Sequence, residues 1–179
     1  MRVRAPTNAN SFSVEMYFFS AEYPEWVCTP YNDFFVTLID SSDPGNPADG
    51  NIAIYSNGAS TWPVGINLVS TAAGLFTQCG NGAIGQCGDG GLYNGCVGTG
   101  ELTGTGFDIV TNGPDLCCPN ARTGGGTGWL TMSGNVEPGE IFEIRFAIWD
   151  TSDALYDSLV LLDNWQWSVE ASEPGVRPS

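Results

Sequence analysis

Four aspartates surround one apolar segment near the C-terminal end of the chain. The stretch "WDTSDALYDSLVLLDNWQW", residues 149–167, contains Asp150, Asp153, Asp157 and Asp163. The first three fall in a loop with small residues that can wrap an ion, whereas Asp163 falls inside the apolar run and is expected to be buried. A buried carboxylate needs an ion pair, hydrogen bonds or a metal. Because the chain has only five basic residues, all arginine, a cation is the expected partner of Asp163.

A second acidic group lies on the connection between two expected strands, in "SAEYPEWVCTPYNDFF". Calcium takes about six to eight oxygen ligands, which loop carboxylates, amides and carbonyls supply. We therefore expect a structural Ca²⁺ ion that joins this loop to the last hairpin. The expected ligands are Glu22, Asp33, Asp150, Asp153, Asp157 and Asp163. Alternatively, the loop acids cap turns or face water, and Asp163 makes a structural hydrogen bond; the spacing does not match an EF-hand.

The amino-acid composition excludes most of the common catalytic groups of residues. Without His or Lys, the chain lacks Ser-His-Asp, Cys-His and Ser-Lys systems. Two carboxylates can hydrolyse glycosides, but nothing in the sequence places a pair across a cleft. Six tryptophans could stack on sugars. Trp165 and Trp167 are expected in the core on one face with Leu159 and Leu161, so an exposed Trp beside the Gly-rich segment would favour a carbohydrate-binding module.

The charge balance limits the partners. Twenty acidic and five basic residues give a net charge of −15, which argues against nucleic acid or an anionic membrane. Such acidity is compatible with cation binding, and equally with the needs of solubility or a salty habitat. No stretch approaches the roughly 20 apolar residues of a membrane span. The segment "MRVRAPTNANSF" lacks the apolar core of a signal peptide, so export is expected to depend on a segment outside this sequence.

Cysteine usage indicates an oxidising compartment. The chain has an even number of cysteines, no C-x-x-C pair and no His, so disulfides are favoured over zinc. The six residues are Cys28, Cys79, Cys87, Cys96, Cys117 and Cys118. The adjacent Cys117 and Cys118 are each expected to pair elsewhere, and the sequence leaves the pairing open.

Strand patterns dominate the chain. Residues 11–19 alternate with Phe12, Val14, Met16 and Phe18 on one face, and residues 140–149 alternate with Phe142, Ile144, Phe146 and Ile148. Further strands are expected at 33–39, 51–55 and 158–169, with weaker candidates at 65–70 and 128–133. The run 158–169 is apolar on both faces, which predicts a strand covered on both sides.

These patterns predict an all-β fold, an antiparallel β-sandwich of jelly-roll type, because no segment has sustained helical periodicity. Residues 71–127 carry most of the glycines and five cysteines, and are expected to form a long Gly/Cys-rich loop excursion. A single domain is expected over residues 1–169. Residues 170–179, "EASEPGVRPS", are polar and aperiodic, which predicts a linker-like tail.

Two long stretches resemble the bacterial choice-of-anchor L family. They are "APTNANSFSVEMYFFSAEYPEWVCTPYNDFFVTLID" and "GWLTMSGNVEPGEIFEIRFAIWDTSDALYDSLVLLDNWQWSV", and the resemblance covers most of residues 3–169. It implies an exported β-rich surface domain that precedes varied C-terminal sorting signals, and it implies no activity. Family members usually carry an additional segment upstream of the match. If that segment contributes strands, this chain is expected to have an open sheet edge, filled by a second chain or a neighbouring subunit.

The expected function is that of a secreted or surface-displayed bacterial structural or adhesion domain, non-catalytic and stabilised by calcium and disulfides. One alternative is a self-assembling extracellular filament or matrix subunit that exchanges strands. Another is a carbohydrate-binding module, and a glycoside hydrolase ranks behind both. The expected partners are other surface proteins, glycans or copies of the chain itself.

Overall fold

A computed structural model describes residues 1–71, 74–85, 91–108, 123–152 and 155–179 of the chain. Strands dominate it, with one short helix, α1 (Leu68–Thr71), and one 3-10 turn (Gly100–Leu102) in these ranges. The strands are β1 (Arg2–Arg4), β2 (Ser11–Ser20), β3 (Phe34–Asp40), β4 (Ile54–Ser56), β5 (Thr61–Gly65), β6 (Gly82–Ala83), β7 (Leu92–Tyr93), β8 (Gly125–Gly126), β9 (Leu130–Asn135), β10 (Ile141–Trp149), β11 (Ser158–Ser168) and β12 (Gly175–Pro178).

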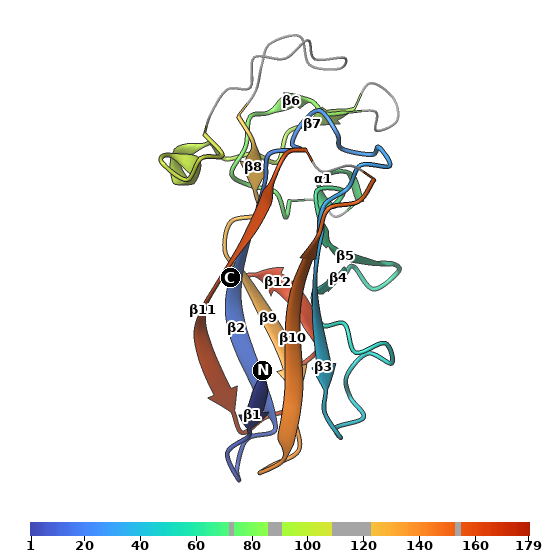
Figure 1. The fold of residues 1–179 in the computed structure, drawn as a ribbon, viewed down its shortest axis with the longest axis vertical. Helices are drawn as coiled ribbons and strands as arrows, with labels where there is room; N and C mark the ends of the chain where they lie inside the picture. The colour runs from blue at the N-terminus through green and yellow to red at the C-terminus, as the bar shows by residue number, and fades with distance from the viewer. Residues whose placement is uncertain (72–73, 86–90, 109–122, 153–154) are drawn as a thin grey trace.

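Two antiparallel sheets form the body of the molecule. The first sheet has the order β1-β10-β3-β5-β4, and the second has the order β11-β2-β9-β12, with β8 added to β2. Figure 1 shows the two sheets side by side along the long axis, with β6, β7, β8 and α1 gathered at the upper end. The predicted all-β class is confirmed, and the jelly-roll connectivity stays a prediction.

The core lies between the sheets, where the predicted alternation places it. Phe12, Val14, Met16 and Phe18 of β2 are all buried. From the facing sheet, the ring of Phe142 stacks on Phe12 at a centroid distance of 5.7 Å. Alternating apolar side chains of two sheets therefore interdigitate, and their burial is the main stabilising contribution to such a sandwich.

The expectation for β11 is wrong in two respects. Its outer face is not covered, because Leu159 and Leu161 are exposed there; among the described strands it pairs only with β2 and forms an edge of the second sheet. Its register also shifts between Asp163 and Gln166, where three steps along β11 correspond to two along β2. Asn164 takes the extra position with φ 52°, a left-handed conformation that Asn tolerates.

The bulge decides which side chains of β11 reach the core. Val160 precedes it and Trp165 and Trp167 follow it, and all three pack against the core. Leu159 and Leu161 point to the other face and are 42% and 43% exposed. The two tryptophans therefore do not share a face with these leucines, because one inserted residue reverses the alternation.

Two weaker predictions also need correction. Residues 65–70 do not form a strand of their own, but the end of β5, a turn and α1. Strand β5 was not predicted because it contains Pro63, a residue that is rare inside sheets. The predicted linker-like tail, 170–179, instead supplies β12, which pairs with β9. Val176 of β12 belongs to the core, so this segment is part of the folded body.

The Gly/Cys-rich excursion is tied internally and to the second sheet. Cys79 and Cys96 form a disulfide, and Cys28 is also disulfide-bonded, whereas Cys87, Cys117 and Cys118 lie outside the described residues. The Tyr93 hydroxyl donates to the Phe76 carbonyl oxygen at 2.6 Å. Because β8 pairs with β2, the described part of the excursion is held against the sandwich.

Glu140 connects the β9–β10 turn to the loop after β3. Its carboxylate accepts hydrogen bonds from Ser41 Oγ, Ser42 Oγ and the amides of Ser42 and Glu137. Burial acts to raise the pKa of Glu140, but these hydrogen bonds outweigh it and lower the pKa below its usual value.

We predict that Glu140→Gln lowers the free energy of unfolding by about 1–2 kcal/mol at pH 7, because the amide replaces a charged acceptor. A lowered carboxyl pKa stabilises the folded state above the unfolded-state pKa, and this stabilisation is lost as the pH falls through the folded-state pKa. The two proteins should therefore converge in acid. Urea unfolding at pH 7 and at acidic pH measures this, and a pH-independent difference would contradict it.

Candidate functional site

Two of the predicted calcium ligands meet at the upper end of the sandwich. Glu22 and Asp33 are 1% and 2% exposed. The Asp33 amide donates to Glu22 Oε2 at 2.9 Å, and Ser158 Oγ donates to Asp33 Oδ2 at 2.5 Å. The loop after β2 and the start of β11 are thus joined through these carboxylates.

The loop before β11 lies beside this pair. Thr151 Oγ1 donates to the Asn32 carbonyl oxygen at 2.7 Å, and the Ala21 amide donates to the Asp157 carbonyl oxygen at 3.1 Å. The two loops are therefore in direct contact, and the calcium ion expected to join them stays a prediction. The carboxylates of Asp150 and Asp157 are on exposed residues, and Asp153 lies outside the described residues.

Asp163 lies apart from this junction. It pairs in register with Glu15 on the bulge of β11, whereas Ser158, at the junction, pairs with Ser20. Asp163 is exposed, so the expectation that it is buried is wrong; in the regular alternation before the bulge it shares the outward face with Leu159 and Leu161. Within the described ranges, no group of three or more His, Cys, Asp or Glu residues is placed to hold a metal ion.

The most distinctive feature of the body is an open edge on β10. Strand β1 pairs with β10 only from Ile141 to Glu143. Beyond these pairs, the Met1 amino group donates to the Ile144 carbonyl oxygen and the Ile144 amide donates to the Met1 carbonyl oxygen. Residues of an antiparallel strand bond alternately to one side and the other. The backbone groups of Phe146 and Ile148 therefore face this edge, where no described strand pairs with them.

Strand β11 forms the neighbouring open edge. It is eleven residues long and has one paired neighbour among the described strands. Leu159, Leu161 and Leu162 are all about 40% exposed. Natural edge strands are usually protected by Lys, Pro or a bulge. Here the bulge at Asn164 and the charge of Asp163 protect only the middle of the strand.

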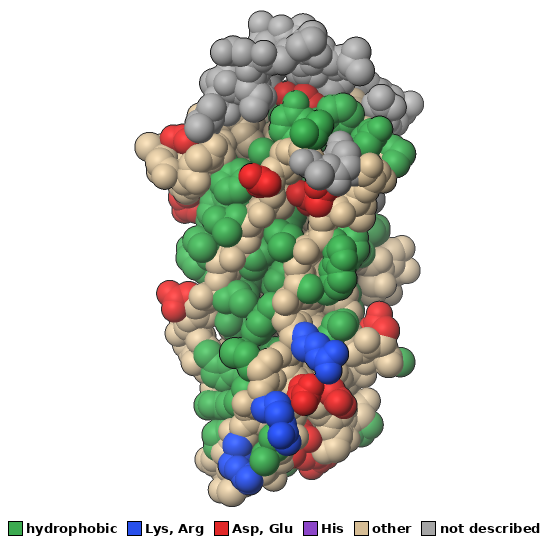
Figure 2. Space-filling model, in the orientation of Figure 1, with side chains coloured by type: hydrophobic (Ala, Val, Ile, Leu, Met, Phe, Trp, Pro, Cys, Tyr) green, Lys and Arg blue, Asp and Glu red, His purple; other side chains and the backbone are tan. Residues whose placement is uncertain are grey.

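An apolar hollow of about 280 Å³ lies between these two edges. Its apolar lining comes from both sheets and reaches the core at Val14, and Figure 2 shows hydrophobic side chains in a band between β11 and β10. The lining residues are Met1, Val14, Phe146, Leu162, Asp163, Asn164 and Trp165. The apolar run of β11 is visible in the sequence, where it predicts a covered strand. The clustering of its exposed apolar residues with those of β10 is visible only in the structure.

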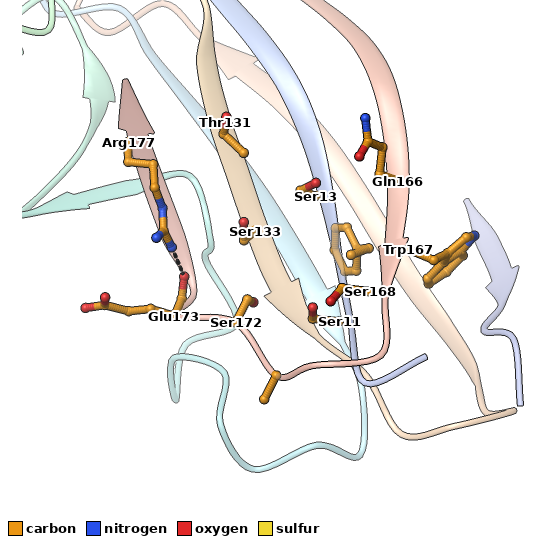
Figure 3. A pocket seen from close by; sticks show the side chains of 12 residues that line it. Ser11, Ser13, Thr131, Ser133, Gln166, Trp167, Ser168, Ser172, Glu173 and Arg177 are labelled. Carbon is orange, nitrogen blue, oxygen red and sulfur yellow. Dashed lines mark hydrogen bonds between the residues drawn. The ribbon is translucent and has the colours of Figure 1, made fainter. Parts of the chain in front are cut away.

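A polar hollow of about 410 Å³ lies on the outer face of the second sheet. Figure 3 shows Ser13, Ser133 and Gln166 along it, with Arg177 donating to the Glu173 carbonyl oxygen at 2.7 Å. Trp167 contributes to the lining, but its indole contacts the core rings of Phe12 and Phe142 edge-on. This hollow therefore offers hydroxyl groups without a free aromatic face.

These features define an all-β, disulfide-containing domain with an incompletely paired edge. The family model of the Choice-of-anchor L domain matches residues 5–167, so the chain belongs to this family. Domains of this family occur in exported surface proteins, which indicates a surface-associated bacterial protein. No curated protein and no solved structure matches the chain. Among the described residues, no helix is long and apolar enough to cross a membrane.

We predict that the amides of Phe146 and Ile148 exchange with solvent faster than those of Arg145 and Ala147, which face β3. Hydrogen–deuterium exchange followed by NMR of the dilute protein measures this. The Ile144 amide, which bonds to Met1, is an internal reference on the same strand. Equal protection of all five amides would contradict an open edge.

Proposed function

We propose that this domain is a non-catalytic adhesion or assembly domain of the bacterial surface, in which an extended strand pairs along β10. The strand is supplied by another polypeptide or by a segment that precedes residue 1. The supporting observation is the unpaired edge at Phe146 and Ile148 above the apolar hollow. Adding a strand to an exposed sheet edge is a common mode of peptide recognition, in which main-chain bonds give affinity and side-chain pockets give specificity.

Strand β1 indicates how such a segment would lie. Val3 packs against the core, whereas Arg2 and Arg4 alternate toward the outside. A strand that continues this register along β10 would direct every second side chain into the hollow beside Phe146, Leu162 and Trp165. Apolar residues are expected at these inward positions and polar or basic residues at the outward ones, because the domain carries a net charge of −15.

The expected affinity of one strand is modest. About four main-chain hydrogen bonds and two buried apolar side chains together contribute about 7–10 kcal/mol. Loss of translational and rotational freedom on association costs about 4–15 kcal/mol, which is comparable to this favourable contribution. Stable attachment would therefore need many displayed copies or a strand tethered close by, and both conditions suit adhesion or assembly at a surface.

We predict that a peptide with alternating Val and Thr and a terminal Lys pair binds the domain, whereas Ile148→Pro weakens binding at least about tenfold. Proline removes the outward amide and obstructs the partner strand. Ile148→Thr is the matched control, because it retains the amide. Isothermal titration measures the affinities, with a peptide of the same composition but without alternation as a second control. Equal binding of both peptides, or of both variants, would contradict strand pairing.

We also propose that Ca²⁺ stabilises the junction at Glu22 and Asp33, with Asp150, Asp153 and Asp157 as further candidate ligands. Glu22 and Asp33 bring two buried carboxyl groups to one junction, where the Asp33 amide donates to Glu22 Oε2, and carboxylate oxygens from loops are the ligands that Ca²⁺ takes. The ion would hold the loop after β2 against the loop before β11. Asp163 is no longer among the candidates, since it lies on the bulge.

We predict that calcium at about 100 times its dissociation constant adds about 2.7 kcal/mol to the stability of the chelator-treated protein. For a chain of this size, the unfolding midpoint should rise by about 5–10 °C. Differential scanning calorimetry with the disulfides intact measures it. Glu22→Gln should remove the rise and Asp163→Asn should retain it; a rise that persists in Glu22→Gln, or no rise at all, would contradict this assignment.

A further inference from the structure

A second surface of the molecule presents an aromatic side chain to solvent in a fixed orientation. Trp129 precedes β9 and is 41% exposed. Its ring meets Tyr17 edge-on at a centroid distance of 5.6 Å, and Tyr17 stacks on Phe19 at 4.0 Å. Tyr17 and Phe19 are both buried, so the indole rests on a rigid support. An exposed ring whose conformation is already restricted loses little entropy when it binds a ligand.

Polar groups from the Gly-rich excursion lie beside this ring. A hollow of about 320 Å³ is lined by Trp129 together with Thr77, Gln78, Glu101, Thr127 and Ser179. Hydrogen bonds hold several of these residues in place. Thr77 Oγ1 donates to the Thr127 carbonyl oxygen at 3.1 Å, and the Glu101 amide donates to Gln78 Oε1 at 3.2 Å. The wall is thus assembled from four separate segments of the chain and is largely preformed.

The Tyr17 hydroxyl lies behind this wall. It is buried and has no hydrogen-bond partner of acceptable geometry among the described residues. Burial, and secondarily the nearby carboxylate of Glu101, raise the pKa of this hydroxyl well above its usual value, with a partial opposing effect from the Gly128 backbone. The hydroxyl therefore stays protonated, and it is a buried polar group beside the Glu101 carboxylate.

The chemistry of the hollow fits a neutral sugar. Its polar lining consists of hydroxyls, an amide and a carboxylate, which exchange hydrogen bonds with sugar hydroxyls, and the indole offers an apolar face to the C–H groups of a pyranose ring. Its volume lies at the lower end of the range for small-molecule sites. Acidic glycans are disfavoured, because Glu101 stands in the wall and the chain carries a charge of −15.

We propose that this hollow binds one or two residues of a neutral oligosaccharide, with Trp129 stacked on a pyranose ring and Glu101 accepting hydrogen bonds from its hydroxyls. The site is independent of the β10 edge, because the residues that line the two hollows do not overlap. The domain would then carry two separate binding surfaces, one for polypeptide and one for glycan.

Titration calorimetry against a panel of neutral tetrasaccharides built from glucose, galactose, mannose, xylose and N-acetylglucosamine tests this proposal. At least one should bind saturably to the wild-type chain at up to about 5 mM. Trp129→Ala and Glu101→Gln should each weaken binding at least about tenfold. The matched control is Trp149→Ala, which removes a tryptophan of comparable exposure, 49%, from β10 and should leave the affinity unchanged.

Three outcomes would overturn the proposal: no binding by any tetrasaccharide of the panel, equal loss in Trp129→Ala and Trp149→Ala, or equal affinity for tetragalacturonate, an acidic probe. The unfolding midpoint of each variant, measured in parallel, separates loss of binding from loss of folding. If Trp129→Ala is unfolded, the conservative Glu101→Gln change of an exposed side chain decides alone.

Discussion

The need of every strand for hydrogen-bonded neighbours governs this molecule. A sheet buries one face easily, but the backbone groups along its edges still require partners or water. Strand β1 meets this requirement for the first part of β10, and nothing in the described part of the chain continues it past Ile144. The unpaired groups of Phe146 and Ile148 and the apolar hollow beside them are two consequences of the same interrupted pairing. Together they provide both the bonds and the burial that an added strand needs.

The bulge at Asn164 determines how the second sheet takes part. Before the bulge, Val160 packs into the sandwich; after it, Trp165 and Trp167 do so. This reversal places two large aromatic rings in the core and leaves Leu159 and Leu161 on the outer face of the sheet. One inserted residue therefore explains both the tryptophan packing and the partly protected edge. Local backbone geometry thereby sets the surface available for binding.

Much of the body could be predicted from the sequence, because apolar and polar residues that alternate with period two indicate a strand with one buried face. It located β2, β3, β9 and β10 and the buried faces of β2 and of the first half of β10. A bulge leaves no comparable mark, so the faces of Trp165 and Leu159 were assigned together although they lie on opposite sides. Pro63 concealed β5, and the polar residues around Val176 concealed β12. The loop that carries Glu22 and Asp33 does contact the start of β11, whereas the calcium ion expected there stays a prediction. The hollows beside Phe146 and Trp129 depend on tertiary arrangement and could not be inferred.

Intermolecular nuclear Overhauser effects from a bound strand test the central claim most directly. In a complex of the isotopically labelled domain with an unlabelled alternating peptide, we expect cross-strand contacts between the peptide backbone and Phe146 and Ile148. We also expect contacts from every second peptide side chain to Leu162 and Trp165. Contacts confined to another surface, or a bound peptide that is not extended, would contradict the claim that this domain works by completing its first sheet.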